Sequence, residues 1–78
     1  MANWFRIEYK DKVTGKTKPM SGFNNCKILQ NTIKEMVEDG TARLSEIRVI
    51  EESDRFNQID VTTWQVGQAK KKIRKAFL

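Results

Sequence analysis

Residues 4–10 read WFRIEYK, and apolar and polar side chains alternate strictly along this stretch. A period of two with aromatic and β-branched residues predicts a half-buried β-strand. Phe5, Ile7 and Tyr9 then face the core, while the polar residues between them face outward. This strand decides the fold, because its apolar face must be covered by a second layer of structure.

Three more strands are expected from the same kind of pattern, over residues 16–22, 42–51 and 57–62. Gly15 favours a turn before the first of these, because glycine takes positive φ at low cost. Pro19 has no N–H for a ladder, which makes its strand an edge. Side chains expected to point inward from the last two strands are those of Ile47, Val49, Ile59 and Val61, with Ile50 on the opposite face.

A first helix is predicted over residues 24–39, with Asn24 as its N-cap and Gly40 closing it. Phe23 and Ile28 would form a hydrophobic staple across that start. Three- and four-residue spacing predicts a buried stripe. Its members are Cys26, Leu29, Ile33, Met36 and Val37. Cys26 is therefore interpreted as a small buried hydrophobe rather than a reactive thiol.

A second helix is predicted after residue 62 and extends to the end of the chain. Thr62 and Gln65 match a capping box, with Thr62 as the N-cap. Trp64 is interpreted as a lid over the core. The buried stripe of this helix would consist of Val66, Ala69, Ile73 and Phe77.

These elements predict a ββαββα chain that forms a single small α+β domain over residues 1–78. An edge position for the second strand places the first strand inside the sheet, next to the third. We therefore expect a mostly antiparallel four-stranded sheet of order 2-1-3-4, with both helices packed on one face.

Composition excludes several kinds of site. The 78 residues include no His and one Cys, so a Ser–His–Asp triad, a His-ligated metal site and an internal disulfide are all ruled out. Acids such as Glu8 and Glu46 have no spacing that indicates catalysis, and ordinary cross-strand pairs account for them. We expect a protein that is not an enzyme and that needs no cofactor or metal.

The sequence contains no run of about 18 apolar residues, so we expect no membrane span. A single Cys without an export signal favours the cytoplasm.

Charge patterning suggests a function. Lys and Arg number 15 against 10 Asp and Glu, and no acid follows Asp60. The predicted second helix would present five cations: Lys70, Lys71, Lys72, Arg74 and Lys75. The first hairpin adds Lys10, Lys12, Lys16 and Lys18. We expect these residues to contact the phosphates of DNA or RNA with little sequence specificity. The same charges also fit a solubilising role and protection of an edge strand against aggregation.

A second interpretation is a protein-docking inhibitor or adaptor that binds an acidic surface of a larger enzyme. Trp4, Arg6, Arg48 and Ile50 would form its contact on the open sheet face, because a Trp beside Arg is typical of interface hot spots. In size and Lys content the chain is similar to small accessory proteins of phages and mobile elements. A homodimer through the fourth strand or the open face is a third possibility, because a core this small gains stability from pairing.

Overall fold

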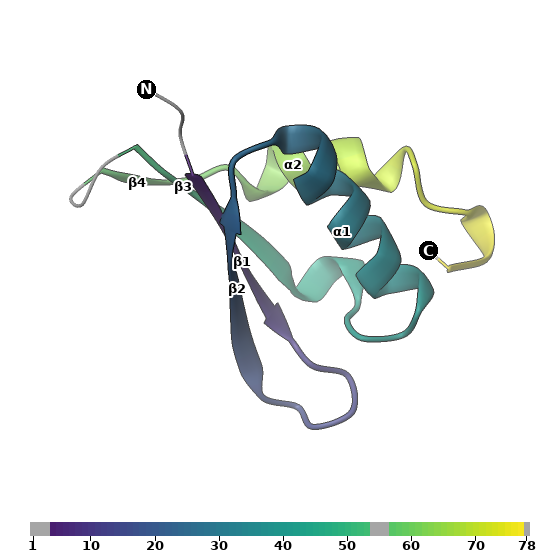
Figure 1. Ribbon diagram of the computed structural model, residues 1–78. Coiled ribbons are helices and arrows are strands. Elements are labelled where there is room, and N and C mark those ends of the chain that lie inside the picture. The colour runs from purple at the N-terminus through teal and green to yellow at the C-terminus, as the bar shows by residue number, and fades with distance from the viewer. Residues whose placement is uncertain (1–3, 54–56, 78) are drawn as a thin grey trace.

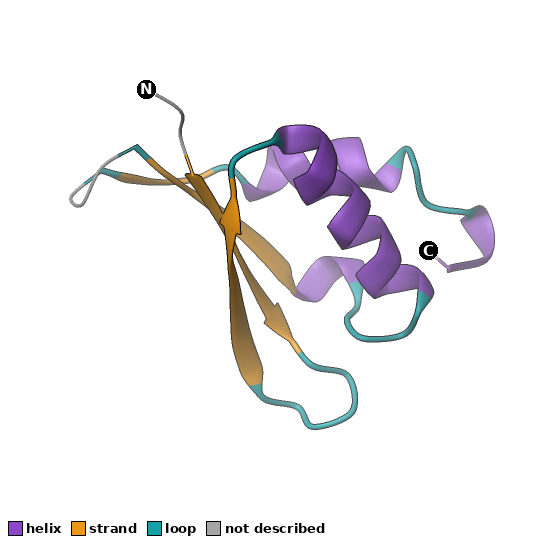
Figure 2. Ribbon diagram, in the orientation of Figure 1, coloured by secondary structure: helices purple, strands orange, loops and turns teal. Residues whose placement is uncertain are grey.

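The computed structural model describes residues 4–53 and 57–77, which form an antiparallel sheet with two helices on one face (Figures 1 and 2). The elements follow one another as β1 (Trp4–Lys10), β2 (Thr17–Phe23), α1 (Cys26–Glu38), β3 (Ile47–Glu52), β4 (Gln58–Asp60) and α2 (Thr62–Lys70). Short 3-10 turns cover Leu44–Glu46 and Lys75–Phe77. The strand order is β2-β1-β3-β4, so the predicted α+β fold and sheet order are confirmed.

Strand β1 lies at the centre of the fold, paired antiparallel with β2 on one side and β3 on the other. Phe5, Ile7 and Tyr9 are buried, as their alternation predicts. They share the core with Val49 of β3 and with residues of both helices. The other face of the sheet carries no helix in the described residues, as Figure 2 shows.

The first helix starts one residue later than expected. Asn25, not Asn24, is the N-cap, and its Oδ1 accepts hydrogen bonds from the amides of Lys27 at 2.8 Å and Ile28 at 3.3 Å. This later start removes the predicted staple, and Ile28 is 56% exposed. Cys26 is exposed rather than buried, because it lies in the first turn, where its sulfur accepts a hydrogen bond from a polar side chain, Gln65.

The rest of the predicted stripe on α1 is correct. Its buried side chains are those of Leu29, Ile33, Met36 and Val37. Gly40 has a φ of +83°, and Thr41 N donates to Met36 O at 2.9 Å, so the helix closes as expected.

The capping box predicted for α2 is wrong, because both of its side chains bond elsewhere. The Thr62 hydroxyl accepts a hydrogen bond from the Val49 amide at 2.9 Å. Gln65 is buried and accepts one from the Gln30 side chain at 2.9 Å, which joins α2 to α1. Ala69 and Ile73 are buried as predicted, whereas the side chain of Phe77 lies outside the described part of the structure.

Two apolar residues, one in β3 and one in β4, do not follow the predicted faces. Ile59 was expected inward and is 56% exposed, because β4 projects away from the two helices (Figure 1). Ile50 was expected on an exposed face and is 7% exposed. No helix in the described residues is long and apolar enough to cross a membrane.

Candidate nucleic-acid interface

The cations near the C-terminus do not share one helix. Helix α2 ends at Lys70, and the chain then turns, with Lys72 N donating to Ala69 O at 2.9 Å. This turn brings Ile73 into the core, where it is 6% exposed. The prediction of a continuous basic helix through Lys75 is therefore wrong. The turn also removes the four-residue helical spacing that would have set like charges beside one another.

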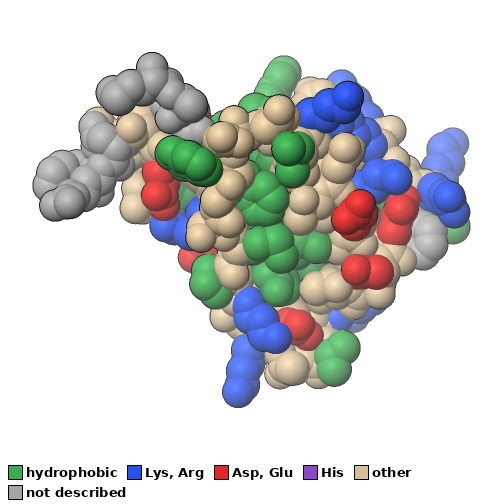
Figure 3. Space-filling model, viewed as in Figure 1, with side chains coloured by type: hydrophobic (Ala, Val, Ile, Leu, Met, Phe, Trp, Pro, Cys, Tyr) green, Lys and Arg blue, Asp and Glu red, His purple; other side chains and the backbone are tan. Residues whose placement is uncertain are grey.

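The segment beyond α2 lies near the end of α1. The backbone amide of Arg74 donates to the Glu38 carboxylate at 3.4 Å. Figure 3 shows acidic side chains beside Lys and Arg on this side of the molecule. The side chains of Lys72, Arg74 and Lys75 are exposed, but acids are close to this segment. They therefore offer a weaker attraction for phosphate than their sequence suggests.

The hairpin lysines differ in their surroundings. Lys18 forms an ion pair with Asp11 at 3.3 Å, so its charge is partly compensated. Lys10, Lys12 and Lys16 are exposed and form no ion pair with a described residue. The Lys12 amide also donates to Thr41 O at 2.8 Å, which fastens the hairpin to the segment after α1.

That attachment places Lys12 at the side of an open groove of about 670 Å³. Three cations line this groove, each from a different segment: Lys12 from the hairpin, Arg43 from the α1–β3 connection and Lys70 from the end of α2. All three are exposed and have no ion-pair partner among the described residues. We call this surface the cationic groove. Its remaining lining residues are Val37, Ala42, Leu44, Ser45, Ile47, Thr62, Thr63, Val66 and Gly67.

The structure thus brings together one residue from each predicted basic cluster, Lys12 and Lys70. The other predicted nucleic-acid residues lie outside the cationic groove. Sequence reasoning missed Arg43, because the segment around it has no periodic pattern. The only indication in the sequence was that Arg43 comes three residues after Gly40, the glycine with positive φ that follows the end of α1.

A second hollow of about 540 Å³ lies on the neighbouring side of α2. Trp64 and Lys71 line it, together with Gln68. Trp64 is 66% exposed, so the prediction that it covers the core is wrong. Thr63 and Gly67 line both hollows, so the cationic groove continues into this second surface.

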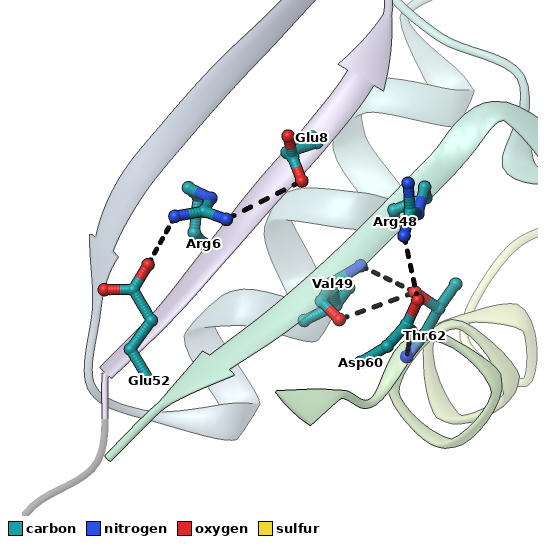
Figure 4. Close-up of polar contacts among 7 residues, drawn as sticks. All are labelled: Arg6, Glu8, Arg48, Val49, Glu52, Asp60 and Thr62. Atoms are coloured by element: carbon teal, nitrogen blue, oxygen red, sulfur yellow. Dashed lines mark hydrogen bonds and ion pairs between the residues drawn. The ribbon is translucent and has the colours of Figure 1, made fainter. Parts of the chain in front are cut away.

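The four residues predicted for docking on the open sheet face differ in their surroundings. Arg6 forms ion pairs with Glu8 and Glu52, and Arg48 pairs with Asp60 at 3.2 Å (Figure 4). Ile50 is buried opposite Arg6 on one side and Asp60 on the other. Trp4 is 49% exposed, and the side chain of Arg48 is also exposed, although it is paired with Asp60.

Two carboxylates of the described surface are held in their ionised form by local hydrogen bonds. Amide donors from Thr14 and Val13, together with Lys18, lower the pKa of Asp11 below its ordinary value. Hydrogen bonds from Thr62, and then from Arg48, lower the pKa of Asp60. Both groups stabilise local backbone structure, so neither is arranged as a general acid. The described residues contain no cluster of three acids or thiols that could hold a metal ion.

No protein-family model matches this chain, and neither does any curated protein or solved structure.

Proposed function

We propose that this protein binds the phosphate backbone of nucleic acids at the cationic groove, without enzymatic activity and with little sequence specificity. One observation carries the proposal: Lys12, Arg43 and Lys70 come from three separate segments and line a single groove. No ion pair with a described residue compensates these three cations, so a polyanion in the groove would supply the missing negative charge.

The shape of the groove supports the same function. Buried and half-buried apolar side chains, including Leu44 and Val66, form part of its surface. Such a surface lies beside the exposed cations and gives a bound strand a wall to lie against. Lys10 and Lys71 lie beside the groove, because each lines a neighbouring hollow that shares residues with it. The proposal places the protein in the cytoplasm, with DNA or RNA as its partner and no cofactor.

Fluorescence anisotropy with labelled DNA and RNA oligonucleotides, at about 50 and about 200 mM salt, tests this function. The groove variant carries Lys12→Gln, Arg43→Gln and Lys70→Gln. A matched control carries Lys72→Gln, Arg74→Gln and Lys75→Gln, which removes the same number of positive charges outside the groove. We expect tight, salt-sensitive binding for the wild type, a large loss for the groove variant and a smaller loss for the control.

An equal loss in both variants would show that only net charge matters and would reject the groove as the site. No binding of any oligonucleotide at low salt would reject the function itself.

Docking onto an acidic protein surface is the second candidate, and the apolar part of the cationic groove favours it. Val37 and Leu44 could receive apolar side chains of a partner while the surrounding cations pair with its acids. This candidate predicts that no oligonucleotide binds in the anisotropy experiment. It also moves the contact from Trp4, Arg6, Arg48 and Ile50 to the groove.

A further inference from the structure

Trp64 has a large apolar side chain that is not packed into the core. It lies in the first half of α2 and is 66% exposed. Its neighbour Gln65 is buried and joins the two helices, so α2 is held firmly beneath the indole. An exposed Trp on a well-fixed helix offers a flat aromatic surface to a partner.

The surroundings of Trp64 are positive and continuous with the cationic groove. Lys71 lines the same hollow as the indole, and the hollow meets the groove at Gly67. A Cβ built at Gly67 meets nothing within 4 Å, so the surface is open at this point. Asp60 is the acid that lines this hollow among the described residues, and Arg48 compensates its charge at 3.2 Å.

We infer that this surface selects single-stranded nucleic acid, with one base stacked on Trp64 and the adjoining phosphates on Lys70 and Lys71. The inference rests on the proposed function and adds the form of the ligand. Single-strand binders combine a positive groove with an exposed aromatic side chain, because every base has a face that can stack. Bases within a duplex are already paired and stacked, so the indole has no base face to contact there.

Charge favours a polyanion over a protein as the occupant. Lys12, Arg43, Lys70 and Lys71 line the two joined hollows and have no ion-pair partner in the described chain. A strand that crosses the joined surface would place successive phosphates near successive cations. If the occupant of this surface were a protein instead, neither nucleic-acid probe in the test below would bind.

The two tryptophans of the chain allow a direct optical test. Trp4→Phe leaves Trp64 as the sole tryptophan, and Trp64→Phe leaves Trp4 on the opposite face of the sheet. The probes are an oligothymidylate of about 15 nucleotides and a duplex of the same length. We expect the single strand to quench the emission of Trp64 and to leave that of Trp4 unchanged. Unchanged Trp64 emission with bound single strand would overturn the inference.

Affinity provides the second readout. Trp64→Ala should weaken single-strand binding between about 5-fold and about 100-fold and leave duplex binding unchanged. Trp64→Phe should recover part of the loss, because it restores an aromatic face. Trp4→Ala is the matched control and should change neither affinity.

The outcomes separate the inference from the proposed function. If Trp64→Ala binds both probes as the wild type does, while the groove variant still loses binding, the stacking inference fails and the proposed function survives. If neither probe binds at low salt, both fail, as they would if Trp64 served a protein partner.

Discussion

The backbone amide of Lys12 donates a 2.8 Å hydrogen bond to the carbonyl oxygen of Thr41. This bond joins the tip of the β1–β2 hairpin to the connection between α1 and β3. Arg43 follows two residues after Thr41, so the bond sets Lys12 and Arg43 at the same groove. Two cations that are far apart in the sequence therefore lie at one groove because of a backbone hydrogen bond. The pattern of side chains in the sequence does not predict such a bond.

Because this contact uses backbone atoms, the Lys12 side chain can be replaced without breaking it. We expect Lys12→Gln to leave the thermal midpoint of unfolding unchanged and to reduce the slope of log affinity against log salt by about 0.7 to 0.9. Anisotropy titrations over a salt series measure that slope. Lys16→Gln, on the same hairpin but outside the groove, should change the slope less. Equal changes in the two variants would contradict the geometry.

Asp11 should make stability depend on pH in the acid range. Its folded pKa is lowered, by the amides of Thr14 and Val13 and then by Lys18. Its contribution is therefore present above the unfolded pKa of about 4 and is lost as pH falls through the lower folded pKa. Asp11→Asn keeps an oxygen acceptor but removes the charge.

Thermal unfolding at about pH 6 and about pH 3 tests this linkage. The wild type should lose more of its thermal midpoint than Asp11→Asn does over that interval. Asp60, whose pKa is also lowered, should leave part of the dependence in the single variant. The double variant Asp11→Asn/Asp60→Asn should have the flattest profile. Parallel losses in all three proteins would rule out these carboxylates as the cause.

The same substitution should have opposite effects at two glycines. Gly67 lies within α2, and a Cβ there meets open space, so Gly67→Ala should stabilise the fold by about 0.5 to 1 kcal/mol. Gly40 has a φ of +83°, so Gly40→Ala should cost about 1 to 2 kcal/mol, although no atom obstructs its side chain. Urea unfolding of the two variants measures both values. Destabilisation in both would show that the Gly67 side of α2 is more crowded than its geometry indicates.

The sheet was predictable because short stretches of the sequence indicate which face of a strand is covered and which strand lies at the edge. The alternation at Phe5, Ile7 and Tyr9 identifies the covered face, and Pro19 identifies the edge. Sheet order follows from these two observations and short connections. The end of α2 was not predictable in this way, because the apolar spacing continues to Ile73 without interruption, whereas the chain leaves the helix after Lys70 and turns.

The candidate site was predictable only in part, because it is assembled from three segments. Charge runs identified Lys12 and Lys70, whereas Arg43 stands in no run and becomes relevant only through the folded position of its segment. The exposure of Trp64 was missed because a Trp beside an apolar stripe ordinarily belongs to the core. The burial of Ile50 was missed because it depends on neighbours across two strand pairs.

The Thr62 side chain supplies a hydrogen-bond acceptor for the Val49 amide of β3, which lies beyond the residues that pair with the short strand β4. Its hydroxyl accepts from the amide of Val49, whose side chain is fully buried, at 2.9 Å, and the Val61 amide donates to Val49 O at 3.0 Å (Figure 4 shows the first contact). Thr62→Val has nearly the same shape but leaves this amide without an acceptor, which should cost about 1 to 3 kcal/mol. Thr62→Ser keeps the hydroxyl and should lose less. Urea unfolding compares the two variants, and equal losses would show that the methyl group, not the hydrogen bond, provides the stability at this position.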